Sequence, residues 1–261
     1  MYSADSAKEG CAKEQNSPCR RRKMVIECIG LPGSGKTFLF DKLSEELRQR
    51  EVEYVNVSER CMNSILWKIG KKLARALIFL SGDARRYRDG MRKLIRGREK
   101  TESSFGIFKD PEYTIRSAAL LIYLYQRMMD SHKIYLFDEG LVHTLVKFCA
   151  DHKVSGRTFL RMASMTERRL SGDRIVVLNE ISLPACLESI ALRNRHICEF
   201  DELSAEQLSE ILGEYARLND LYKERFGVLA VRREDKVRVS VSRIIGRIKK
   251  LLAKASRKAA Q

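Results

Sequence analysis

The stretch Ile29–Phe40, IGLPGSGKTFLF, decides the fold. Within it, Gly30–Thr37 fits the phosphate-loop (Walker A) pattern G-x-x-x-x-G-K-[ST]. Glycines let the backbone curl so that successive N–H groups converge on a phosphate, and the helix that follows adds its positive dipole end. The apolar run MVIECI before the loop predicts a buried strand, and the segment after it predicts a helix. A strand before the loop and a helix after it are the setting in which this motif binds phosphate.

The motif assigns a role to each of its residues. We expect Lys36 to reach the β- and γ-phosphates of ATP and the Thr37 hydroxyl to bind Mg²⁺. A further metal contact is expected from Asp138, which follows the apolar run IYLF at the carboxyl end of a predicted strand. The backbone that should cradle the phosphates comprises Gly30, Leu31, Pro32, Gly33, Ser34, Gly35, Lys36 and Thr37.

The order of apolar segments predicts an α/β fold. Strands are expected at 24–29, 52–57, 133–137, 174–180 and 228–231. Helices are expected at 36–50, 61–80, 114–130, 157–169, from the fourth strand through Arg193, at 204–226 and from about Val239. Because strands alternate with helices, we expect a P-loop NTPase fold with a five-stranded parallel sheet between helices.

The expected organisation is one domain with polar ends. Residues 1–22 are predicted to be a disordered tail, 23–251 a kinase-like P-loop domain, and 252–261 a basic C-terminal tail. Residues 82–112 are basic and polar without a clear period, which predicts a helical or mobile segment within a basic insertion, 68–112.

The positive charge is concentrated in two segments. The formal net charge is +16, and 68–98 and 232–258 each contain 11 Lys/Arg residues against two acidic ones. The rest of the chain is close to neutral. Such segments favour anionic partners, namely a phosphorylated substrate, nucleic acid or an anionic membrane surface, although solvated helix faces would give the same pattern.

Cysteine usage and hydropathy indicate a cytoplasmic protein. The seven cysteines occur singly without a C-x-x-C pair, which argues against structural zinc, and several lie in apolar runs typical of a core. This suits a reducing cytosol. We expect no signal peptide and no transmembrane segment, because no apolar run approaches the roughly 20 residues that span a bilayer.

Several classes of P-loop protein fit poorly. There is no N-K-x-D run of the kind that gives GTPases their guanine selectivity. The two LSG runs, Leu80–Gly82 and Leu170–Gly172, are each followed by Asp, so neither continues as the LSGGQ-like signature of ABC ATPases. What remains resembles the nucleotide and nucleoside kinases, with thymidylate kinase nearest in layout over roughly Met24 to Leu251. The resemblance implies a phosphotransferase that uses ATP and Mg²⁺, with lid arginines at Arg193 and Arg195 and substrate contacts near Gln126 and Arg127.

The sequence departs from these kinases after the third strand. Thymidylate kinases have Asp-Arg there and deoxynucleoside kinases have Glu-Arg, whereas this chain has Asp138-Glu139. Glu139 could therefore take a proton from an acceptor hydroxyl. Glu59, after the second strand, is a rival base that matches an acidic residue of similar kinases. His143 is assigned no role.

The expected function is transfer of a phosphoryl group from ATP to a small acceptor, a nucleotide, nucleoside or sugar. Two alternatives stay open. One is a nucleotide-dependent switch or ATPase that binds nucleic acid through the basic segments. The other is peripheral membrane contact through 61–80 or 239–258, where basic and apolar residues share one predicted helix.

Overall fold

The computed structural model describes residues 24–57, 82–96, 104–105, 111–128, 133–170, 173–192 and 199–259. Its strands are β1 (Met24–Ile29), β2 (Tyr54–Asn56), β3 (Ile134–Phe137), β4 (Asp173–Glu180) and β5 (Leu229–Arg232). Its helices are α1 (Lys36–Gln49), α4 (Gly82–Arg96), α5 (Pro111–Met128), α6 (Leu141–Asp151), α7 (Gly156–Glu167), α8 (Leu183–Ala191), the 3₁₀ helix η1 (Glu199–Glu202), α9 (Ala205–Phe226) and α10 (Val237–Ala259). The expected tail 1–22 and the expected helix 61–80 lie outside the described residues.

The five strands form one parallel sheet in the order β2-β3-β1-β4-β5. This confirms the predicted fold class, and all five predicted strands are present with ends that differ from the prediction by at most two residues. Because β1 lies between β3 and β4, the residues that follow these three strands meet at one edge of the sheet. That edge contains the phosphate loop and Asp138.

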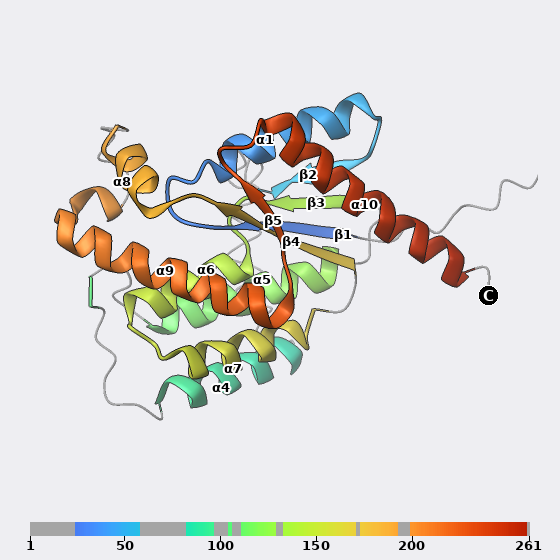
Figure 1. The fold of residues 1–261 in the computed structure, drawn as a ribbon. Coiled ribbons are helices and arrows are strands. Elements are labelled where there is room, and N and C mark those ends of the chain that lie inside the picture. The colour runs from blue at the N-terminus through green and yellow to red at the C-terminus, as the bar shows by residue number, and fades with distance from the viewer. Residues whose placement is uncertain are drawn as a thin grey trace, which may run out of the picture.

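Helices α1 and α10 cover one face of the sheet (Figure 1). Helix α10 is amphipathic because its apolar side packs on the sheet and α1. Its residues buried in this core are Val241, Ile244, Ile245 and Ile248. They are therefore not available to a membrane surface, which weakens the case for membrane docking through 239–258. No helix in the described ranges is long and apolar enough to cross a bilayer.

Helices α5, α6 and α9 cover the other face, and α4 and α7 form a further layer outside them (Figure 1). Helix α6 was not expected from the sequence. It is apolar nearly all round, with buried residues on every side, because it lies between the sheet and other helices. Such a helix has no polar face and gives no clear helical period.

Helix α4 lies in the basic segment whose period could not be recognised. Ala84, Tyr87 and Met91 lie on one side of it and are buried against the core. The hydroxyl group of Tyr87 lies 3.0 Å from Thr166 Oγ1 of α7. This part of the segment is therefore a packed helix with a basic outer face, and the small number of apolar residues hid its period.

Candidate phosphate-binding site

The loop Gly30–Thr37 curls between β1 and α1 as the motif predicts. Gly30, Gly33 and Gly35 have φ angles of 139°, 86° and 86°, which residues with a Cβ rarely adopt. At Gly30 space is limiting as well, because a Cβ there would lie 2.6 Å from the carbonyl oxygen of Asn179 in β4. Glycine at these positions is thus required both by the turn and by the neighbouring strand.

The carbonyl groups of the loop are held by side chains from outside it. The Asn179 amide donates to Ser34 O at 2.8 Å, and Arg233 Nη1 donates to Gly33 O at 2.9 Å. Ser189 Oγ and Cys186 Sγ of α8 donate to the carbonyls of Gly33 and Pro32, at 3.2 and 2.8 Å. In a trans peptide unit the N–H points opposite to the C=O. These contacts therefore direct the N–H groups of Gly33 and Gly35 toward the other side of the loop, where a phosphate would bind.

The Lys36 side chain folds back over this loop. Its Nζ donates to Leu31 O at 3.1 Å and to Gly30 O at 3.4 Å, and the residue is buried. Burial lowers the pKa of the Lys36 ammonium group, while the negative charges of Glu139 and Asp138 act in the opposite direction. The cation is thus held between the loop and the two carboxylates that follow β3.

Thr37 and Asp138 meet directly, although 101 residues separate them. Thr37 Oγ1 donates to Asp138 Oδ2 at 3.2 Å. The contact follows from the sheet, because β1 and β3 pair as far as Glu27 and Phe137, one residue before Asp138. A hydroxyl and a carboxylate oxygen suit Mg²⁺, which usually takes one or two protein ligands besides phosphates and water. The described residues contain no group of three or more His, Cys, Asp or Glu side chains that could hold a metal.

Glu139 lies in the same turn, and its side chain is 62% exposed. Its Oε1 is 3.5 Å from Nε2 of His143, a buried residue in the first turn of α6. Burial lowers the pKa of His143 well below its ordinary value, and the charges of Lys36 and Lys147 lower it further. The imidazole is therefore neutral near pH 7. This histidine lies next to the expected base, which the sequence did not indicate.

The buried carboxylate of Glu27 holds the turn between β3 and α6, and the sequence analysis missed it. Glu27 in β1 is fully buried, and its Oε2 accepts hydrogen bonds from Leu141 N at 2.7 Å and from Tyr125 Oη at 2.8 Å. Its other oxygen pairs with Arg174 of β4, which also contacts Glu167 at 2.7 Å. A carboxylate at the N-terminus of α6 complements the helix dipole. The signal in the sequence was a charged residue inside the apolar run MVIECI.

The structure does not test the remaining expected site residues. Glu59, Arg193 and Arg195 lie outside the described residues. Gln126 and Arg127 are in α5, and the Gln126 amide lies 3.5 Å from the carbonyl oxygen of Arg169, beyond the end of α7. Their roles in substrate binding stay predictions. The polar contacts of Asn179, Arg233 and Ser189 with the loop were also missed, because they depend on distant strands.

A solved structure shares this fold. A structure of deoxyadenosine kinase from M. mycoides with the products dCMP and a flexible dCDP bound has a TM-score of 0.51 and 14% identity, and the match covers 87% of this chain and 100% of that one. Two further structures of that kinase, with dCTP and with dATP bound, give TM-scores of 0.45 and 0.49, each at 14% identity over 87% of this chain and over 100% and 99% of theirs. No family model and no curated protein matches the sequence. The chain thus has the fold of a P-loop nucleoside kinase.

Proposed function

We propose that this protein is a kinase that transfers the γ-phosphoryl group of ATP to a small acceptor with the help of Mg²⁺. The observation that carries the proposal is the contact between Thr37 and Asp138, 3.2 Å apart beside Lys36. A hydroxyl, a carboxylate and an ammonium group at the mouth of a phosphate loop are the parts that phosphoryl transfer requires. The fold shared with a deoxyadenosine kinase supports this reading.

The donor nucleotide would be held by the loop. The N–H groups of Gly33 and Gly35 would contact its phosphates, and Lys36 would exchange its two backbone acceptors, Gly30 O and Leu31 O, for the β- and γ-phosphate oxygens. Thr37 and Asp138 would hold Mg²⁺, which would neutralise charge on those oxygens when bound. The anchored carbonyls of the loop keep this cradle open before the nucleotide arrives, so little reorganisation is needed.

Transfer of the phosphoryl group needs a proton acceptor but no covalent intermediate with the protein. We propose that Glu139 takes the proton of the acceptor hydroxyl while the oxygen of that hydroxyl forms a bond to the γ-phosphorus. The bond from that phosphorus to the β–γ bridging oxygen breaks, and ADP leaves. Glu139 is exposed toward solvent, where an acceptor can reach it. Glu59 remains the rival base, and we propose Arg193 and Arg195 as cations that close over the transferred group.

The acceptor is proposed to be a nucleoside or nucleotide, with sugars as the next class. The support comes from the M. mycoides deoxyadenosine kinase, which has the same fold and was solved with deoxynucleotide products bound. Glu139 occupies the position where similar kinases have a phosphate-binding arginine, so an acceptor hydroxyl is favoured over an acceptor phosphate. We also propose a cytoplasmic location, in keeping with the buried cysteines Cys28, Cys149 and Cys186.

A coupled assay of ADP release tests the proposal directly. Purified protein is screened with ATP and Mg²⁺ against nucleosides, nucleoside monophosphates and sugars. Lys36→Ala should abolish ADP release that depends on an acceptor. Lys42→Ala, in the same helix but exposed and paired with Glu45, should leave it unchanged. ADP release that is equal in the wild type and Lys36→Ala, or absent with every acceptor, would contradict the proposal.

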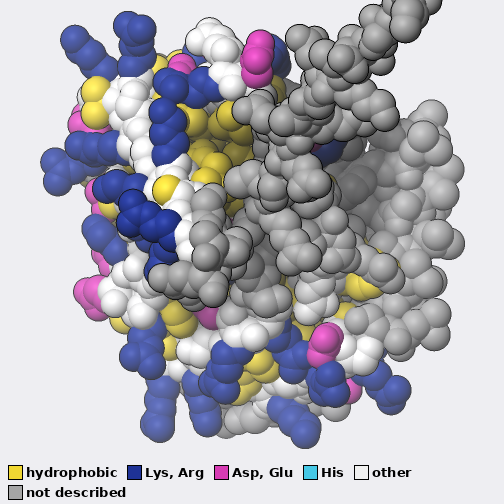
Figure 2. Space-filling model, turned by 90° about the vertical axis from the view of Figure 1, so that its right-hand side faces the viewer, with side chains coloured by type: hydrophobic (Ala, Val, Ile, Leu, Met, Phe, Trp, Pro, Cys, Tyr) yellow, Lys and Arg dark blue, Asp and Glu magenta, His cyan; other side chains and the backbone are white. Residues whose placement is uncertain are grey.

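A second candidate function is nucleotide-dependent binding of nucleic acid. Figure 2 shows many Lys and Arg side chains on the face that it draws, with Asp and Glu side chains between some of them. On α10 the exposed cations include Arg243, Arg247, Lys249 and Lys250. Binding to a phosphate backbone should fall steeply with salt. A gel shift with DNA and RNA at two salt concentrations, beside ATPase assays with and without nucleic acid, separates this function from the kinase.

A further inference from the structure

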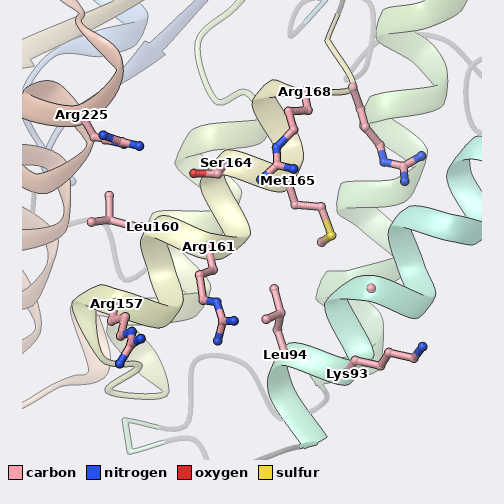
Figure 3. A pocket seen from close by; sticks show the side chains of 11 residues that line it. Lys93, Leu94, Arg157, Leu160, Arg161, Ser164, Met165, Arg168 and Arg225 are labelled. Atoms are coloured by element: carbon pink, nitrogen blue, oxygen red, sulfur yellow. The ribbon is translucent and has the colours of Figure 1, made fainter.

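A second cationic site lies away from the phosphate loop, on the outer layer of helices. A pocket of about 750 Å³ opens between α4, α7 and the end of α9 (Figure 3). Of the 11 described residues that line it, six are basic and none is acidic. The basic ones are Lys93, Arg157, Arg161, Arg168, Arg169 and Arg225. Helices α5, α6 and α9 separate this outer layer from the sheet (Figure 1).

Two acidic residues near this pocket are already paired. Glu167 at the end of α7 contacts Arg174 and the hydroxyl group of Tyr222, and Asp83 contacts both Arg86 and the pocket residue Arg169. Among the six cations, only Arg169 forms an ion pair within the described part of the chain, with Asp83. The positive charge of the pocket is therefore largely uncompensated by the protein.

The arrangement of arginines on α7 is unfavourable without an anion. Arg157 and Arg161 lie four residues apart on one exposed face, and like charges at this spacing destabilise a helix. The opposite face, with Phe159 and Met162, is buried in the core. The helix is thus fixed in orientation, and its arginines must point outward together. A bound anion would remove this repulsion.

The pocket also has an apolar component. Leu94, Leu160 and Met165 line it and are partly buried. A Cβ at Gly90 would lie 2.7 Å from Met165 Sδ, so this glycine allows α4 to approach α7 closely. Figure 3 shows Leu94 on α4 directed toward α7, Lys93 extending along α4 away from α7, and Arg225 extending from α9 toward α7. The cations thus come from three helices around a concave surface.

We propose that this pocket binds a small molecule that carries two or more phosphate groups on an uncharged body. Guanidinium groups pair with phosphate oxygens through two parallel hydrogen bonds, and several of them around one hollow favour clustered phosphates. The volume lies within the roughly 300–1,000 Å³ of typical small-molecule pockets. The apolar residues would contact the uncharged body. A hollow whose lining cations come from α4, α7 with the turn after it, and α9 suits a compact ligand better than an extended polymer.

Binding of myo-inositol hexakisphosphate, measured by titration calorimetry at about 0.15 M salt, tests the proposal. Its phosphates surround an uncharged ring, and inorganic phosphate serves as the single-phosphate comparison. The double variant Arg161→Ala/Arg168→Ala should weaken binding at least about tenfold, because each substitution removes a charged hydrogen-bond donor. The matched double variant Arg238→Ala/Arg247→Ala removes the same charge from exposed positions of α10 and should change affinity little.

Three further measurements make the result decisive. Lys36→Ala should leave the affinity unchanged, since loss of binding in that variant would place the ligand in the phosphate loop and overturn the proposal. Equal weakening in both double variants would show non-specific attraction and would also overturn it. A single-stranded oligonucleotide or phosphatidylserine vesicles that bind more tightly than the inositol phosphate, and depend on Arg161 and Arg168, would assign the pocket to a polymer or a membrane instead.

Thermal unfolding gives a readout that does not depend on the kinase activity. The inositol phosphate should raise the unfolding temperature of the wild type and of the α10 variant, but not that of Arg161→Ala/Arg168→Ala. Both arginines are exposed, so the substituted protein should fold. Without ligand, its unfolding temperature should be no lower than that of the wild type, because a repulsive pair has been removed.

Discussion

The carboxylate of Glu27 holds the backbone amide of Leu141, with 2.7 Å between Oε2 and N. This contact joins the middle of the central strand β1 to the first residue of α6, 114 positions further along the chain. The turn between β3 and α6 contains Asp138, Glu139 and Gly140. Glu27 is thus a positioning residue: it fixes the backbone from which the proposed metal ligand and base project.

We expect Glu27→Gln to destabilise the protein by up to about 3 kcal/mol, because it removes the buried one of the two carboxylates that Arg174 contacts and leaves Glu167 as its charged partner. Urea unfolding measures the change. Glu45→Gln, which disrupts an exposed pair with Lys42, should cost less than about 1 kcal/mol. The double variant Glu27→Leu/Arg174→Met should be less destabilised than Glu27→Leu alone, since no charge is left buried. If it is not, the ion pair is not the source of the effect.

Gly140→Ala tests the same turn through its shape. Gly140 has an extended backbone that alanine can adopt, but the new Cβ would lie 2.7 Å from Tyr125 Oη and closer still to the Glu27 carboxylate. We expect a loss of about 1–3 kcal/mol in the free energy of unfolding and a fall in kinase turnover, as Asp138 is displaced. Gly246→Ala in α10 is the control. Its Cβ meets no atom within 4 Å, so it should stabilise the helix by about 0.5–1 kcal/mol.

The phosphate loop and the fold could be predicted because their signals are local. Gly30–Thr37 is contiguous, and its glycines, lysine and threonine have fixed roles in one backbone shape. Asp138 could be placed beside it because it follows an apolar strand, and strand ends meet at one edge of a parallel sheet. Alternation of strands and helices then sufficed for the architecture, without any knowledge of packing.

The support for the site could not be predicted, because it depends on register between distant strands. Glu27 and Arg174 lie 147 positions apart and meet only because β1 and β4 pair with Val25 opposite Arg174. Asn179 likewise reaches the loop from β4. Helix α4 was hidden for another reason. Its buried face consists of a few residues among many arginines, so the helical spacing of those apolar residues could not be recognised in the basic segment.

Asn179→Ala should weaken nucleotide binding without contacting the nucleotide. The substitution leaves the carbonyl group of Ser34 without its donor in a buried site, which costs about 1–3 kcal/mol, and frees that peptide to rotate. We expect the dissociation constant for ATP to rise about tenfold or more, as measured by fluorescence with a labelled nucleotide. Ser204→Ala is the matched control, because it removes the cap of α9, where Ser204 Oγ accepts from Gln207 N, at a cost of about 1 kcal/mol. Equal loss of affinity in both variants would show that general destabilisation, and not loop geometry, is responsible.

His143 should make the stability depend on pH in a definite direction. Burial lowers its pKa in the folded protein, so below its ordinary value of 6.5 the unfolded chain takes up a proton that the folded protein does not. The free energy of unfolding should therefore fall as the pH falls below 6.5, and one such group contributes up to about 1.4 kcal/mol per pH unit. Urea unfolding of the wild type and His143→Gln between about pH 5.5 and 7.5 measures this, because above about pH 5 most carboxylates stay ionised.

The free energy of unfolding of His143→Gln should lack the part of the pH dependence that His143 contributes, while the wild type shows it. His152 provides the internal control. Burial lowers its pKa too, but Asp151 opposes this, and the residue is unchanged in both proteins, so its contribution cancels in the difference. A difference between the two proteins that is constant across the pH range would mean that folding does not shift the pKa of His143. A slope of the opposite sign would mean that the imidazole beside Glu139 is held as a cation in the folded protein. Either result would contradict the expectation.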